Sequence, residues 1–304
     1  MDVTPQNLRA IYTSLSTSFN QRLRATTTLY GRVAMDVNST SSKNEYPRLD
    51  DLPGFREWVG DRHVHDLSEM TYAIQNKSFE KTIGIDRDKI EDDEIGIFTP
   101  VVQQFGQDTA LFPDLLVFDL MKRANQVVCY DSQYFFDTDH PSYNDQGREI
   151  SVSNFQAGAG PAWYLIDDSQ VIKPFIYQKR RPFTFVSRTA LTDDNVFNAK
   201  KFVYGVDGRC NVGVGMWQTA FMSKAALTPD NYAAARAAMT SIRRRDGAPL
   251  AIAPRILVVP PALEGAARAL MANDMISKDV GGTPVAVSNE WKGTAEVLVV
   301  PYLG

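Results

Sequence analysis

The chain has 304 residues and a net charge of −4, with 32 Lys and Arg against 36 Asp and Glu. This balance argues against a dedicated nucleic-acid binder, because such proteins usually carry a basic surplus. Apolar residues make up 44% and charged residues 22%, which predicts a packed globular core. The chain has two cysteines, no signal-peptide pattern and no apolar run of about 18 residues. These features predict free thiols in a reducing environment and no membrane span.

The first segment, residues 1–25, has the pattern of an amino-terminal helix. Thr4 is a typical capping residue, and Pro5 would occupy the first helical position. The apolar positions at helical spacing are Leu8, Ile11, Tyr12, Leu15 and Phe19. Such a stripe fits either a core helix or an arm that packs on a neighbouring subunit, and periodicity alone leaves both alternatives open.

Residues 41–81 are mostly polar and predict a long protruding ribbon or hairpin. Tyr46 precedes a proline, Phe55 and Trp58 belong to a short amphipathic piece, and a polar alternating pattern follows. An isolated two-stranded ribbon is only marginally stable in water. We therefore expect this ribbon to lie on another surface, with a second subunit as the candidate.

Residues 82–126 are the stretch around which we expect the chain to be organised. A strand that includes Ile83 and Ile85 is followed by an acidic turn at 91–94, which suits the positive amino end of a helix. A long helix is then predicted over 93–124, and its bend is expected at a proline. The inward face is predicted to carry Ile97, Val101 and Phe105, flanked by Phe98 and Val102.

The middle of the chain reads as strands separated by loops. Strands are expected over 127–134, 162–166, 172–186 and 202–221, and the glycines of the last predict a bulged or strongly twisted strand. Residues 135–141 are predicted to form a loop, and residues 142–161 a surface excursion. Trp163 and Trp217 lie in apolar runs, and we expect both in cores.

The last third predicts a compact α/β unit. A capped helix starts at Thr228 and Pro229. A β-branched strand follows over 256–259, a second helix starts at the prolines 260–261, and a final strand covers 296–303.

Candidate chemistry is sparse in this sequence. His140 lies near Asp131, Asp137, Asp139 and Cys129, which resembles a metal cluster but lacks a second His or Cys at ligand spacing. His63 and His65 share a predicted strand face without a third ligand nearby. No serine-hydrolase elbow and no phosphate-binding glycine motif occurs. We therefore predict no catalytic, cofactor-binding or metal-binding residue, and we keep as an alternative a metal-dependent enzyme using the loop 129–140.

An ordered set of short segments resembles the major head subunit (major capsid protein) family of Mu-like phages and prophages. The segments are 74–77 (IQNK), 85–93 (IDRDKIEDD), 112–118 (FPDLLVF), 129–131 (CYD), 135–141 (FFDTDHP), 163–167 (WYLID), 173–175 (KPF), 204–209 (YGVDGR), 216–218 (MWQ), 257–261 (LVVPP) and 301–303 (PYL). They span nearly the whole chain in order.

The resemblance implies an α+β fold of the Hong Kong 97 type found in tailed-phage capsids. It implies an amino-terminal arm over 1–40, an extended loop over 41–81, a peripheral domain over 82–220 with the spine helix 93–124, and an axial domain over 221–304. Intersubunit contacts are expected at Leu8, Ile11, Tyr46, Phe55 and Trp58.

The function that this resemblance implies is structural, not enzymatic, and a phage tail structural protein is a second alternative. Copies of the chain would assemble as hexamers and pentamers into an icosahedral head around double-stranded DNA, without sequence-specific DNA contacts and without a cofactor. The implied partners are a separate scaffolding protein and maturation protease, a portal and possible decoration proteins. The expected location is the virion, after assembly in the host cell cytoplasm, and no local signature favours a Lys–Asn cross-link.

Overall fold

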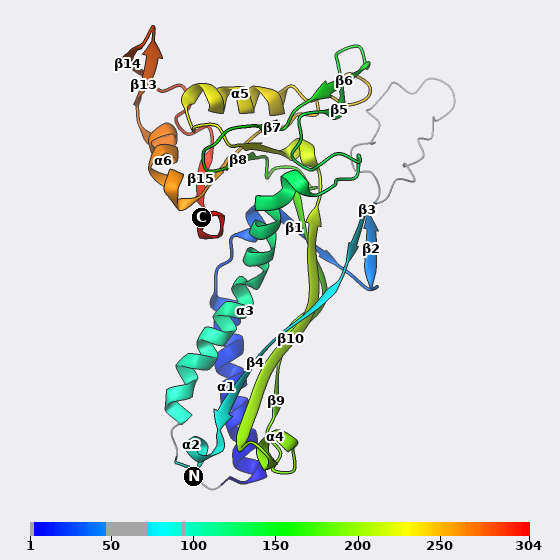
Figure 1. Ribbon diagram of the computed structural model, residues 1–304, viewed down its shortest axis with the longest axis vertical. Coiled ribbons are helices and arrows are strands. Elements are labelled where there is room, and N and C mark those ends of the chain that lie inside the picture. The colour runs from blue at the N-terminus through cyan, green and yellow to red at the C-terminus, as the bar shows by residue number, and fades with distance from the viewer. Residues whose placement is uncertain (1–2, 47–71, 93–94) are drawn as a thin grey trace, which may run out of the picture.

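The computed structural model describes residues 3–46, 72–92 and 95–304. The molecule is elongated, with a narrow lower part made of two long helices beside a long curved sheet, and a broad upper part built on a second sheet (Figure 1). The chain begins at the lower end and finishes where the two parts meet. None of the described helices is long and apolar enough to cross a membrane.

The lower sheet has four strands in the order β1-β9-β10-β4. Strand β1 runs parallel to β9, and the other neighbours are antiparallel. The pairing of β9 with β10 shifts register between Asp207 and Cys210, which confirms the bulge that the glycines of this strand predict. The four strands are β1 (Ala34–Asn38), β4 (Lys77–Asp86), β9 (Phe175–Arg188) and β10 (Lys201–Val214).

Two long helices, α1 (Pro5–Ala25) and α3 (Ile95–Arg123), lie side by side along this sheet (Figure 1). The Thr4 side chain accepts a hydrogen bond from the Asn7 N–H, so the predicted cap of α1 is confirmed. Phe19 of α1, Phe105 of α3 and Phe185 of β9 form an aromatic cluster with ring centroids 5.0–6.3 Å apart. Because each fully buried large apolar side chain contributes about 1.5–3 kcal/mol, this cluster fastens α1 to its own chain.

The spine helix is confirmed, but its predicted inward face is partly wrong. Val102 and Phe105 are buried, whereas Ile97 is 65% exposed and Val101 49% exposed. Pro100 lies inside the helix, because α3 already starts at Ile95. The short helix α2 (Arg87–Glu91), which Asp86 caps, precedes the expected acidic turn at 91–94, of which residues 93 and 94 lie outside the described residues.

The upper sheet has the strand order β15-β12-β8-β11-β7. Its strands are β7 (Phe155–Gln156), β8 (Trp163–Ile166), β11 (Ala220–Ser223), β12 (Ile256–Val259) and β15 (Glu296–Val299). Alternate residues of β8 join different core clusters, with Trp163 and Leu165 beside α5 (Pro229–Thr240) and α6 (Glu264–Ala272). Tyr164 and Ile166 pack with the carboxyl half of α3. This sheet is therefore covered on both faces, and it contains β7 and β8 from the segment 82–220 as well as strands of the carboxyl-terminal segment.

Among the described residues, three further pairs of strands form two-stranded hairpins. They pair β2 (Lys43–Tyr46) with β3 (Tyr72–Gln75), β5 (His140–Tyr143) with β6 (Glu149–Val152), and β13 (Met275–Val280) with β14 (Thr283–Ser288). The remaining helices are α4 (Asp194–Phe197) and the 3-10 turns η1 (Tyr30–Arg32), η2 (Ala124–Gln126), η3 (Trp217–Thr219), η4 (Pro261–Leu263) and η5 (Pro301–Leu303).

Three expectations for the middle of the chain are corrected. Residues 127–134 hold a single bridge between Val128 and Tyr134 instead of a strand, because the chain turns back on itself there. His140 starts strand β5 and is not in a loop. Trp217 is fully buried as predicted, but it lies in the 3-10 turn η3 between two strands.

Candidate functional site

The residues that resemble a metal cluster form a structural link. His140 Nδ1 lies 2.7 Å from Asp131 Oδ2, and both side chains are fully buried. The His140 ring stacks on Trp217 with centroids 4.0 Å apart. Within residues 3–46, 72–92 and 95–304, no three His, Cys, Asp or Glu side chains gather in a way that could hold a metal ion. The pair therefore ties the start of β5 to the turn that holds Asp131, because a buried ionisable side chain needs a polar partner. The ring stacking ties the same residue to η3.

The predicted contact residues fall into different surroundings. Leu8 and Ile11 are buried in the core between α1, α3 and the lower sheet, which favours a role within the chain for both. The Tyr46 hydroxyl donates to Gln178 Oε1 of β9 at 2.8 Å, so this ring ties the β2–β3 hairpin to its own sheet. Phe55, Trp58, His63 and His65 lie outside the described residues.

Exposed apolar side chains mark surfaces that the sequence did not identify. Ile97 and Val101 lie one helical turn apart on α3, and Phe197 of α4 is 80% exposed. All three belong to the elements of the lower part of the molecule. A folded chain seldom leaves neighbouring large apolar side chains in water unless another surface covers them.

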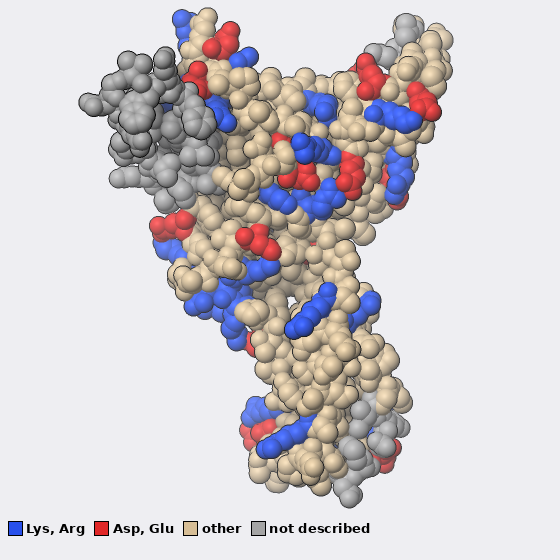
Figure 2. Space-filling model, turned by 180° about the vertical axis from the view of Figure 1, so that it is seen from behind, with Lys and Arg blue, Asp and Glu red and all other residues tan. Residues whose placement is uncertain are grey.

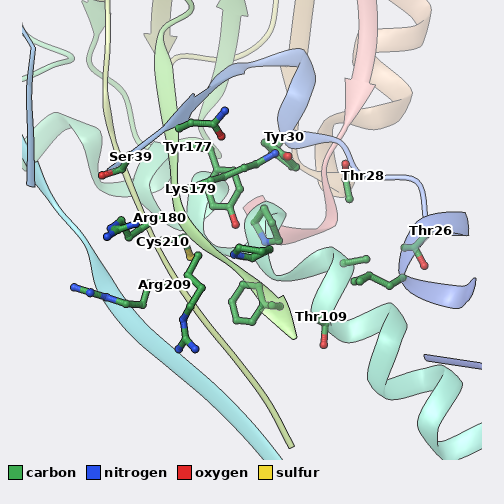
Figure 3. Close-up of a pocket in the computed structure, with 17 residues that line it drawn as sticks. Thr26, Thr28, Tyr30, Ser39, Thr109, Tyr177, Lys179, Arg180, Arg209 and Cys210 are labelled. Atoms are coloured by element: carbon green, nitrogen blue, oxygen red, sulfur yellow. The ribbon is translucent and has the colours of Figure 1, made fainter. Parts of the chain in front are cut away.

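A cationic cavity lies near the middle of the lower part. It has a volume of about 650 Å³, and Figure 3 shows threonines on one side of it and arginines on the other. Its charged lining residues are Lys179, Arg180, Arg181 and Arg209. Two of them have carboxylate partners, since Lys179 Nζ lies 2.6 Å from Asp36 Oδ2 and Arg181 pairs with Asp207.

Aromatic and small polar residues complete the wall of this cavity. Tyr30 and Tyr177 pack edge to face, with centroids 5.1 Å apart, and Lys179 lies over the Tyr177 ring. Burial raises the pKa of the Tyr30 hydroxyl, so this ring stays neutral at physiological pH. Burial by itself would lower the pKa of Lys179. The Asp36 carboxylate and the Tyr30 hydroxyl together raise it by more, so the pKa of Lys179 lies above its usual value. The lysine is therefore cationic.

The two parts of the molecule carry charge differently on the face seen in Figure 2. On the broad upper part, blue and red atoms are interspersed. Around the waist, blue atoms predominate. The basic run 179–181 has no local pattern that marks a site, because only the fold brings Arg209 and the tyrosines beside it.

Comparison with known proteins shows which family this chain resembles. The family profile described as Mu-like prophage major head subunit gpT matches residues 8–303. The major capsid protein of Escherichia phage Mu is 38% identical over 309 residues, covering all of both chains.

Solved structures give the same result. A chain from the procapsid of bacteriophage JBD30 superimposes with a TM-score of 0.84 at 38% identity, covering 99% of this chain and 100% of that one. A chain from the JBD30 capsid decorated with minor capsid protein trimers gives a TM-score of 0.74 at 28% identity, with 90% of both chains covered.

These similarities confirm the α+β fold of the Hong Kong 97 type and decide against the alternatives of a metal-dependent enzyme and a tail protein. The protein is a structural component of the phage head, with its place in the virion. The chain belongs to the Mu-like prophage major head subunit family.

Proposed function

We propose that copies of this chain assemble as hexamers and pentamers into a closed icosahedral head that encloses double-stranded DNA. The observation that supports this most is the similarity over almost the full length to a procapsid subunit. The contacts with DNA are taken to be independent of sequence, since the chain carries a net charge of −4 and no nucleic-acid-binding motif.

The proposed domains are assigned from the two sheets. The lower sheet with α3 acts as the peripheral domain, and the carboxyl-terminal segment 221–304 contributes the axial domain around the five-fold and six-fold centres. Residues 1–40 act as the arm, and residues 41–81 form a loop that lies over a neighbouring subunit. Phe55 and Trp58 contact that neighbour, and Tyr46 anchors the loop at its base through Gln178.

The exposed apolar residues of the lower part support an assembling subunit. Ile97, Val101 and Phe197 lose contact with water only if a second chain covers them. At about 25 cal/mol per Å² of apolar surface, a few such side chains at each interface contribute several kcal/mol before the cost of association is subtracted.

Further partners are proposed from the same family membership. A separate scaffolding protein and maturation protease would direct assembly, and a portal would occupy one vertex. Decoration is supported by the JBD30 capsid, which is decorated with minor capsid protein trimers.

Negative-stain electron microscopy of the purified chain tests the proposal. We expect closed shells of uniform diameter with clusters of five and six subunits. A control sample in denaturant should lose all particles and regain them on dialysis. Tubes of constant width, or subunits that remain single at every concentration, would contradict the proposed function.

A further inference from the structure

The cationic cavity carries two positive charges that the other described residues do not neutralise. Within residues 3–46, 72–92 and 95–304, no carboxylate lines the cavity. Asp36 and Asp207 neutralise Lys179 and Arg181. Among the described residues, Arg180 and Arg209 form no ion pair, and Arg209 Nε is buried without a hydrogen-bond partner. A buried donor without an acceptor costs about 1–3 kcal/mol. An acceptor from outside the described residues would remove this cost at Arg209.

The strand register makes this deficit larger. Arg209 of β10 lies directly opposite Arg181 of β9 in the antiparallel pair. Like charges at directly opposed positions destabilise a sheet. Asp207 offsets the charge of Arg181, so the repulsion is fully relieved only if a second carboxylate pairs with Arg209, and a carboxylate can accept several charge-assisted hydrogen bonds.

An unpaired strand edge borders the same cavity. Strand β1 pairs with β9 only as far as Asn38 opposite Lys179, and the Ser39 N–H donates to the Lys179 carbonyl at 2.7 Å. In the part of the chain that the structure describes, no strand pairs with β9 on this side beyond Lys179. Pro182 lies on this edge, which is where a sheet tolerates proline. An extended segment can therefore reach the arginines by running along β9.

The size and setting of the cavity favour a carboxylate-bearing segment over nucleic acid. The cavity is partly open and is bordered by α1, α3 and the sheet, and its volume of about 650 Å³ admits several side chains but not a DNA duplex. The chain itself carries 36 acidic residues, so any neighbouring copy can supply carboxylates. We propose that the cavity receives an acidic segment of a second copy of this chain, whose carboxylates pair with Arg180 and Arg209. This inference rests on the proposed function, because it takes the partner to be another subunit.

The test removes both charges and measures assembly. The variant Arg180→Gln with Arg209→Gln keeps side-chain length and polarity but lowers the cavity charge by two. The matched control is Arg148→Gln with Arg244→Gln, which makes the same charge change at residues that do not line the cavity. Sedimentation measures the threshold concentration at which shells form, and circular dichroism of unassembled subunits confirms that each variant is folded.

We expect the threshold concentration of the cavity variant to rise about tenfold, because two partly exposed ion pairs are lost per subunit. The control should assemble at the wild-type threshold. A folded cavity variant that also assembles at the wild-type threshold overturns the inference and leaves the proposed function intact, whereas a wild-type chain that never assembles contradicts the proposed function itself.

A second experiment tests whether the cavity binds nucleic acid instead. It uses a short DNA duplex as the probe and fluorescence anisotropy as the readout. Unassembled subunits of the wild type and of the cavity variant are expected to bind the duplex equally weakly. If the wild type binds the duplex and the cavity variant loses that binding, the arginines take phosphate groups and the assignment to a second copy is overturned.

Discussion

The backbone of Gly106 in α3 lies directly against the carbonyl oxygen of Phe19 in α1. A Cβ atom at position 106 would fall 2.5 Å from that oxygen, which is closer than real Cβ contacts allow. The two helices pack this closely only because residue 106 has no side chain. Residues 1–40 are proposed to act as an arm, and this contact shows how firmly the helical part of that segment is held by its own chain.

The first prediction is that Gly106→Ala destabilises the subunit. The clashing neighbour is backbone, so the helices must move apart, and we expect a net loss of about 1–2 kcal/mol despite the better helix propensity of alanine. Denaturant unfolding of unassembled subunits measures this loss. Gly96→Ala in the same helix is the control, since a Cβ atom there meets nothing within 4 Å, and equal stability of both variants would disprove the close contact.

The second prediction concerns the buried tryptophans. Trp163 donates from Nε1 to the Ala225 carbonyl at 2.9 Å, and Trp217 supports the ring of His140. Truncating either to alanine should cost about 3–5 kcal/mol and give insoluble protein. Trp291→Ala should be milder, because Trp291 is only half-buried. Wild-type yields of soluble Trp217→Ala would contradict its placement in the core.

The third prediction separates folding from assembly at the exposed face of α3. The double variant Ile97→Asp with Val101→Asp should unfold within about 0.5 kcal/mol of the wild type, because both side chains are exposed. Shell formation should be lost, since charges would be buried at the interface. Gln103→Asp, at an exposed polar position of the same helix, should assemble normally. Unimpaired shells from the double variant would show that this face stays in solvent.

The fourth prediction concerns pH and the pair formed by Arg32 and Glu296. Two bonds of 3.0 and 2.9 Å join the guanidinium to the carboxylate, and they lower the pKa of Glu296. The stability from this pair is therefore fully present above the unfolded pKa of about 4.3 and is lost as pH falls through the lower folded value.

The Arg32–Glu296 pair is tested by Glu296→Gln. Because both side chains are partly exposed, the variant should lose at most about 1 kcal/mol at pH 7. It should also lose less further stability than the wild type between pH 5 and pH 3. Unfolding curves across this range measure both effects, and the exposed Glu149→Gln is the control. If the variant loses as much stability as the wild type between pH 5 and pH 3, the pair does not stabilise the fold.

Much of the fold could be predicted where local signals were strong. The caps at Thr4 and Thr228, each followed by proline, start α1 and α5 as expected. The hairpin β13–β14 was missed although a signal existed, namely Gly281 and Gly282 between two runs of β-forming residues. Both glycines adopt positive φ values of 63° and 86°, as a two-residue hairpin turn requires.

Other features could not be predicted because they depend on tertiary packing. Helix α3 offers two apolar stripes, and periodicity alone could not decide whether Val101 or Val102 faces the core. The cationic cavity unites Lys179 with Arg209 only after β9 and β10 pair, so no local pattern marks it. The contacts proposed for Phe55 and Trp58 stay predictions.

The central claim is that this chain is a shell-forming subunit. Sedimentation velocity of the purified protein over a range of concentrations tests it most directly. Above a threshold concentration we expect one sharp boundary of a particle built from many tens of subunits, with few species between this particle and the free subunit. A single slow boundary with the mass of one chain, at every concentration and salt condition, would contradict the account.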